Sequence, residues 1–119
     1  MVRIVRLDEA RNLGLAGRTS LEIFSANEGA EAVTLRYVEI PVPAADEGLR
    51  RPHTHNDCEE CIHVLSGHGM FCTADGESEL VPGDTVLVPP GELHVTRNTG
   101  DTPLALLCFF PVSDLRAHR

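Results

Sequence analysis

Short apolar runs, divided by turn-forming residues, repeat along this chain and favour an all-β fold. Each run is rich in β-branched or aromatic residues, and most are separated from the next by Gly, Pro, Asn or Asp. The runs are VRIVRL, SLEIF, AVTLRYVEI, CIHVLS, MFCTA, SELV, DTVLVP, LHVTRN and LALLCFF. Runs of this kind are typical of a β-sandwich or β-barrel. No long window carries a helical apolar stripe, and only DEARNLGL is expected to form a helical turn.

Length and charge narrow the possible functions. At 119 residues the chain has the size of one domain with one hydrophobic core. Its formal net charge of -8 would repel phosphate, so we expect no nucleic-acid partner. Charged residues interrupt every apolar stretch of MVRIVRLDEARN, and no apolar run is long enough to cross a bilayer. The sequence therefore predicts neither a signal peptide nor a membrane span. We expect a cytoplasmic location.

The four cysteines, at positions 58, 61, 72 and 108, are expected to be thiols, because the chain shows no secretory signal. Cys58 and Cys61 form a CxxC pair, which is typical of a redox motif or of half a zinc site. Here the pair is expected to straddle a turn and a strand, and the other two cysteines are not spaced as a second pair. We therefore assign these thiols no function.

Three histidines and a carboxylate are spaced so that they can share one metal ion. His53 and His55 are two residues apart, so on an extended strand their side chains point to the same side. The Asn-Asp pair after them favours a turn, which would bring a carboxylate of Glu59-Glu60 opposite the histidines. His94 follows a rigid Pro-Pro-Gly turn that can aim it at the same point. Imidazoles with one carboxylate suit Fe, Mn, Ni, Cu or Zn.

The segments that carry these residues resemble the paired motifs of the cupin superfamily. The first motif covers residues 48–67 and the second covers residues 83–98. The resemblance implies an all-β double-stranded β-helix, the jelly-roll barrel of cupins, with residues 1–119 as a single domain. Small cupins tend to pair through outer strands, and VRIVRL would be a bare edge strand in a monomer, so we expect a homodimer.

The resemblance also chooses between the two adjacent glutamates. The family pattern places six residues between the glutamate and the glycine that closes the first motif, and only Glu60 stands that far from Gly67. Glu59 is then expected to be solvated. The implied metal ligands are His53, His55, Glu60 and His94.

Strand alternation sorts the polar residues near these ligands. His63 lies three positions after Glu60, so it is expected to face outward and not to bind metal. Thr96 and Asn98 share the face of His94, where they would line a cavity or support the ligands, although Asn98 is equally suited to holding a turn.

Arg36 and Tyr37 are adjacent in a predicted strand and must face opposite ways, but the sequence does not say which looks inward. If Tyr37 faces the metal, it is a candidate catalytic acid or base. If Arg36 does, it is a candidate anchor for a substrate carboxylate. The alternative is a packed tyrosine and a surface arginine.

The predicted ligand set favours a functional metal over a structural one. Structural zinc is closed and tetrahedral, whereas an octahedral ion held by three histidines and one glutamate keeps two positions open. Proteins similar to this one include dioxygenases, decarboxylases, isomerases and lyases. Our first hypothesis is a metalloenzyme that acts on an oxygenated small molecule. The second is a non-catalytic sensor or carrier of a small molecule or of the metal itself.

Overall fold

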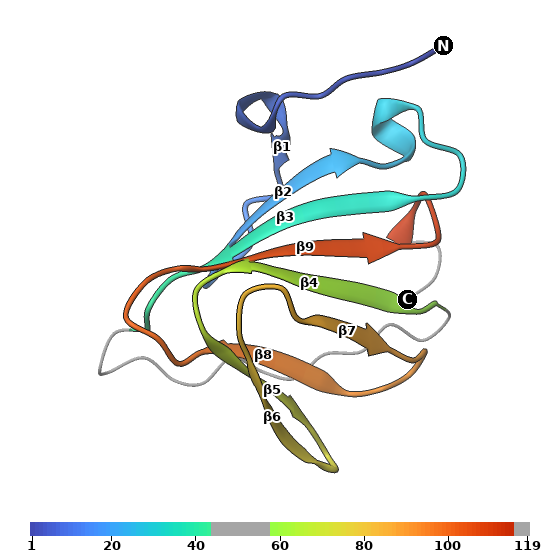
Figure 1. Cartoon of the computed structure of the whole chain (residues 1–119). Helices are drawn as coiled ribbons and strands as arrows, with labels where there is room; N and C mark the ends of the chain where they lie inside the picture. The colour runs from blue at the N-terminus through green and yellow to red at the C-terminus, as the bar shows by residue number, and fades with distance from the viewer. Residues whose placement is uncertain (44–57, 116–119) are drawn as a thin grey trace.

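The computed structural model describes residues 1–43 and 58–115, and these ranges fold almost entirely as β-structure (Figure 1). The strands are β1 (Arg11–Asn12), β2 (Thr19–Phe24), β3 (Thr34–Ile40), β4 (Glu60–Ser66), β5 (Gly69–Thr73), β6 (Gly76–Leu80), β7 (Thr85–Val88), β8 (His94–Asn98) and β9 (Leu104–Phe110). Two short 3₁₀ turns, η1 (Leu7–Glu9) and η2 (Ala26–Glu28), accompany the strands. The predicted all-β class is confirmed.

The strands form two antiparallel sheets. The larger sheet has the order β1-β2-β3-β9-β4-β7, and the smaller has the order β6-β5-β8. From β4 onward the chain alternates between them, since β4, β7 and β9 belong to the larger sheet while β5, β6 and β8 belong to the smaller. Figure 1 shows the smaller sheet lying below the curved larger sheet. A residue at the start of a strand in one sheet can therefore lie next to a residue at the start of a strand in the other sheet.

Alternating side chains of the larger sheet build the core. On β9, Leu104, Leu106, Cys108 and Phe110 are buried, and they pack with alternate residues of β3 and β4. Full burial of one such large apolar side chain contributes about 1.5–3 kcal/mol. The core thus helps to fix the register of β3 and β4, which carry Arg36 and Glu60.

Gly67 ends the first motif because no other residue fits there. Its φ of 87° lies in the left-handed region that favours glycine. A Cβ at this position would lie 2.6 Å from the carbonyl oxygen of Pro103. Close backbone contact at the turn between β4 and β5 therefore explains the glycine on which the choice of Glu60 rests.

One predicted strand is wrong. VRIVRL forms no strand, and the sheet begins only with the two residues of β1. Val2 and Ile4 are exposed, because a run with arginines at positions 3 and 6 has no continuous apolar face to bury. Each of the other eight runs contains or overlaps a strand, and the expected helical turn in DEARNLGL appears as η1.

The expectation that the four cysteines are thiols rather than disulfides is confirmed. Cys58 and Cys108 are part of the apolar core. No helix in the ranges 1–43 and 58–115 has the length and hydropathy that a membrane span requires.

Candidate metal centre

Glu60 and His94 come from different sheets and meet in the interior. Each is the first residue of its strand, Glu60 of β4 and His94 of β8. Glu60 Oε1 lies 3.2 Å from His94 Nε2, and the residues are only 5% and 1% exposed. Along β4, Glu60 shares the buried face with Ile62 and Val64, whereas Glu59 is exposed as expected. The carboxylate that the motif pattern selects is therefore the one that points inward.

The imidazole of His94 is held in one orientation. Its Nδ1 atom lies 2.8 Å from the carbonyl oxygen of Glu92. A carbonyl only accepts hydrogen bonds, so Nδ1 carries a proton and donates it there. The ring of Phe71 stacks against the imidazole, with centroids 5.7 Å apart. His94 therefore directs Nε2, and not Nδ1, toward Glu60.

A positive charge, either a proton or a cation, would stabilise the contact between Glu60 and His94. If His94 is neutral with its proton on Nδ1, then Nε2 and the Glu60 carboxylate are two acceptors that face each other. Burial by itself lowers the pKa of His94, but the hydrogen bonds and negative charge that Glu60 and Glu92 supply raise the pKa above its usual 6.5. A metal-free chain therefore keeps a proton here to higher pH than an ordinary histidine would. A divalent cation would satisfy both groups instead.

Two of the four predicted ligands, His53 and His55, lie outside the described residues. Within the ranges 1–43 and 58–115, no group of three His, Cys, Asp or Glu side chains could hold an ion. The structure brings together Glu60 and His94, and the four-ligand set stays a prediction. The donor chemistry of the pair, one carboxylate and one oriented imidazole, fits a transition metal.

Arg36, not Tyr37, faces the interior. On β3 the buried residues are Thr34, Val38 and Ile40, and Arg36 shares their face. Tyr37 lies on the opposite face, where its hydroxyl donates to Glu39 Oε2 at 3.0 Å. In the strand register Arg36 is opposite Cys108 of β9, and β9 in turn pairs with β4. The strand β9 therefore lies between Arg36 and the strand that carries Glu60. The roles assigned to these two residues remain predictions.

Arg36 has a partner that the sequence did not reveal. Its Nε and Nη2 atoms donate to Glu22 Oε1 at 3.1 and 2.9 Å, and its guanidinium lies over the ring of Phe110. Glu22 stands in SLEIF, whose alternation suggests that Leu21 and Ile23 face the core. In the structure Ser20 and Glu22 are the buried pair instead.

The other polar residues near the motifs divide as alternation predicts. Thr96 and Asn98 are buried on the face of His94, and His63 is exposed with Nδ1 2.7 Å from the Thr85 hydroxyl. Of the two roles left open for Asn98, the structure supports the turn. Its amide donates to the carbonyls of Ile40 and Thr102, and its oxygen accepts from Gly100 N.

The cupin domain family matches residues 36–110, a range that includes Glu60 and His94. This chain is a cupin. It is 36% identical over 70 residues to an uncharacterized protein of Methanocaldococcus jannaschii, covering 59% of the cupin and 54% of that protein. It is 32% identical over 111 residues to germin-like protein 5-1 of Oryza sativa subsp. japonica, covering 84% of the cupin and 50% of that protein. The cupin thus spans about half the length of these curated relatives.

Solved structures confirm the predicted jelly-roll barrel. The polyketide cyclase RemF from Streptomyces resistomycificus superposes with a TM-score of 0.78 at 22% identity, over 93% of the cupin and 80% of RemF. Oxalate decarboxylase of Bacillus subtilis, which has Mn(II) centres, superposes with a TM-score of 0.78 at 23% identity, over 92% of the cupin and 29% of that chain. At these identities the likeness shows the fold alone.

Proposed function

We propose that this cupin is a single-domain, metal-dependent enzyme that acts on an oxygenated small molecule. His53, His55, Glu60 and His94 would hold one divalent transition metal, with Fe, Mn, Ni, Zn and Cu as the candidates. The observation that carries this proposal is the buried contact between Glu60 Oε1 and His94 Nε2 at 3.2 Å. The Mn(II) centres of a protein with the same fold support it.

The residues of this chain would prepare the site before any substrate arrives. Glu60 brings one negative charge into the interior, and the Glu92 carbonyl and the Phe71 ring hold His94 in place. Because these groups are buried, their electrostatic interactions are stronger than they would be in water. When bound, the metal would supply Lewis-acid chemistry or, if it is iron, oxygen activation.

The structure favours only one of the two candidate catalytic residues. Arg36 is on the inner face, where a guanidinium can bind a carboxylate through paired hydrogen bonds. Burial raises the pKa of Tyr37, and its hydrogen bond to Glu39 raises it further, so the phenol stays protonated at neutral pH. Tyr37 also lies on the outer face of the larger sheet, whereas Glu60 lies on the buried face. We therefore leave Tyr37 out of the proposed chemistry and keep Arg36 only as a carboxylate-binding residue apart from the metal, since β9 lies between β3 and β4.

The most direct test of function pairs two histidine variants. His94→Ala should lose metal and all metal-dependent turnover, whereas His63→Ala should keep both, because His63 is exposed on the outer face. Turnover is measured by NMR, with small dicarboxylates, sugar phosphates and β-dicarbonyl compounds as substrates for the metal-loaded protein. If wild-type protein binds metal but consumes none of these classes, a carrier or sensor replaces the enzyme. Equal metal retention by both variants would contradict the ligand assignment.

We also propose that two copies pair through the outer face of the larger sheet. Leu87 and Phe109 are exposed there, and each lies opposite Cys61 in the strand register. Contiguous exposed apolar groups of this kind mark contact surfaces. Sedimentation velocity should show a dimer for the wild type and a monomer for Leu87→Asp combined with Phe109→Asp. A wild-type monomer at micromolar concentration would rule the pairing out.

A further inference from the structure

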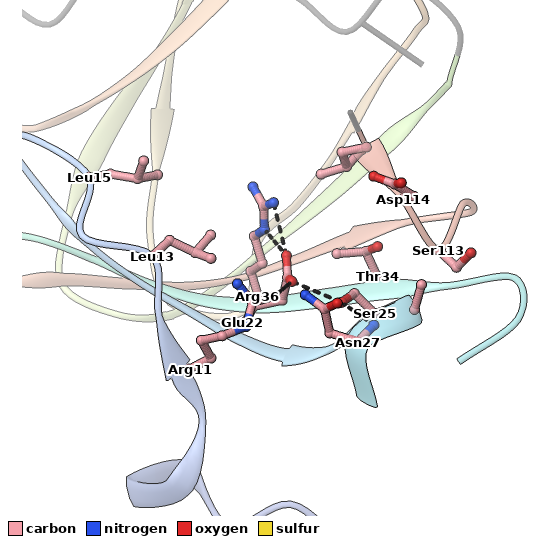
Figure 2. A pocket seen from close by; sticks show the side chains of 12 residues that line it. Arg11, Leu13, Leu15, Glu22, Ser25, Asn27, Thr34, Arg36, Ser113 and Asp114 are labelled. Carbon is pink, nitrogen blue, oxygen red and sulfur yellow. Dashed lines mark hydrogen bonds and ion pairs between the residues drawn. The ribbon is translucent and has the colours of Figure 1, made fainter. Parts of the chain in front are cut away.

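A second site lies on the inner side of β1, β2 and β3, where a cavity of about 240 Å³ opens beside Arg36 (Figure 2). Neither Glu60 nor His94 lines it. Figure 2 shows the Arg36 guanidinium and the Glu22 carboxylate pointing toward each other, with Leu13 and Leu15 on one side of this pair. A charged group and an apolar wall thus border the same space.

Arg36 keeps hydrogen-bonding capacity that its own partner does not use. An arginine has five N–H donors. Among the described residues, Glu22 accepts the only hydrogen bonds that Arg36 donates, and both go to Oε1. The Arg36 side chain is only 15% exposed, and it lines the cavity. A positioned and mostly buried guanidinium with N–H groups left over is suited to bind an acid.

Glu22 cannot be the group that uses those donors, because its carboxylate is already surrounded. Arg11 Nη2 and Arg36 both form ion pairs with Glu22, and the Ser25 hydroxyl donates to Oε2 at 2.8 Å. With Glu22 held in this way, the plane of the Arg36 guanidinium is fixed by two hydrogen bonds and by the Phe110 ring. Such fixed geometry reduces the entropy that a ligand must lose to be bound.

The surrounding charges favour a ligand with a single negative charge. Burial lowers the pKa of Arg18, and the positive charge of Arg36 lowers it further, so a third arginine lies within electrostatic reach. Asp114 also lines the cavity and would repel a second negative charge on a ligand such as phosphate. The charge pattern therefore suits a monoanion.

We propose that this cavity binds a small monocarboxylic acid, with its carboxylate on Arg36 and its hydrocarbon part against Leu13, Leu15 and Leu115. These leucines line the cavity, and Leu115 belongs to the apolar core. Binding there needs no metal.

Isothermal titration calorimetry with hexanoate, on the metal-loaded protein, tests the proposal. Hexanoate should bind saturably, while 1-hexanol and inorganic phosphate should bind at least about tenfold more weakly, as expected when a charge-assisted hydrogen bond is lost or a charge is repelled. Removal of metal with a chelator should leave hexanoate affinity unchanged. Loss of binding on chelation would place the carboxylate on the metal and overturn the proposal.

Three variants locate the site. Arg36→Met should weaken hexanoate binding about tenfold or more, since it removes the charged donor. Leu15→Trp should weaken hexanoate binding to a similar extent, because the larger side chain would fill part of the cavity that Leu15 lines. This variant leaves every ion pair in place, so it still tests the site if Arg36→Met fails to fold. Arg97→Met is the matched control, because Arg97 pairs with Glu77 and does not line the cavity. Wild-type affinity in Leu15→Trp, or no binding by the wild type, would overturn the proposal.

Discussion

Two buried glutamates on the larger sheet, Glu22 of β2 and Glu60 of β4, have opposite surroundings. They are 6% and 5% exposed. Glu22 receives the donors of two permanently charged arginines and of Ser25. Glu60 faces the Nε2 atom of a histidine whose other nitrogen already donates to a carbonyl. Burial therefore does not distinguish the proposed metal ligand from the residue of a structural ion pair, whereas the partner of each carboxylate does.

The difference has a simple electrostatic cause. A buried carboxylate needs a compensating positive charge, because desolvation of an unpaired charge costs several kcal/mol. At Glu22 the positive charge comes from two side chains of the protein itself, Arg11 and Arg36. At Glu60 a proton on His94 or a bound ion can supply that charge. The first site is closed to metal, and the second is suited to it.

The largest expected effect is the loss of stability in Glu22→Gln. Removal of one member of a buried ion pair typically costs about 3–5 kcal/mol, and we expect the lower end because the Arg11 side chain is 44% exposed. In chelator-treated protein, Glu60→Gln should cost less, since His94, whose Nε2 lies 3.2 Å from Glu60 Oε1, can lose its proton, whereas the arginines that pair with Glu22 stay charged. Urea unfolding of both variants measures the two losses. Equal losses would mean that the two carboxylates have similar surroundings after all.

Metal affinity, unlike stability, should depend strongly on Glu60. Glu60→Gln should weaken metal binding more than the roughly 10–100-fold typical of changes at groups that only hydrogen-bond to a ligand. The matched control is Glu59→Gln, which changes an exposed neighbour and should bind metal as the wild type does. Competition with a fluorescent chelator gives both affinities. A loss in Glu59→Gln instead would exchange the roles of the two glutamates.

A smaller effect is expected when a single donor to Glu22 is removed. Ser25→Ala deletes a hydroxyl that lies 2.8 Å from Glu22 Oε2 and 3.0 Å from Glu28 Oε1 and can donate its one proton to either carboxylate. Its loss should lower the free energy of unfolding by about 1.5–3 kcal/mol, the range for a hydrogen bond to a charged group. Ser78→Ala, at an exposed position of β6, is the control and should change little. Thermal and urea unfolding would compare them. Stability unchanged by Ser25→Ala would show that the arginines alone satisfy Glu22.

The smallest expected effect extends the comparison to a third glutamate, Glu39, on the outer face. Burial and then Glu39 raise the pKa of Tyr37 above 10.0, so phenolate should form only at higher pH than in a free tyrosine. The chain has one tyrosine and no tryptophan, so ultraviolet absorbance follows this single group. Glu39→Gln should lower the pKa of Tyr37 without returning it to the ordinary value, because burial remains. A normal pKa in the wild type would place Tyr37 elsewhere.

Much of the fold could be predicted because it depends on local patterns. Runs such as LALLCFF and LHVTRN form strands where the alternation of apolar residues matches a half-buried sheet. The strand predicted for VRIVRL is wrong because this run has the composition of a strand but an arginine on each of its two faces.

The site could be predicted only in part. Glu60 was distinguishable from Glu59 by its spacing to Gly67, and the left-handed backbone at Gly67 gives that spacing a physical reason. Glu22 was not foreseen, because its importance comes from Arg11 and Arg36, which are distant in sequence. Such long-range charge pairing leaves no periodic signal within one strand.

The most direct test of the metal centre is the metal content of the purified chain, measured by inductively coupled plasma mass spectrometry on the wild type beside Glu60→Gln. We predict about one transition-metal ion per chain in the wild type, as expected for one mononuclear site, and a marked loss in the variant. A wild-type protein that contains no metal and takes up none on dialysis, or a variant with the same content, would contradict the assignment of Glu60 and His94 to a metal centre.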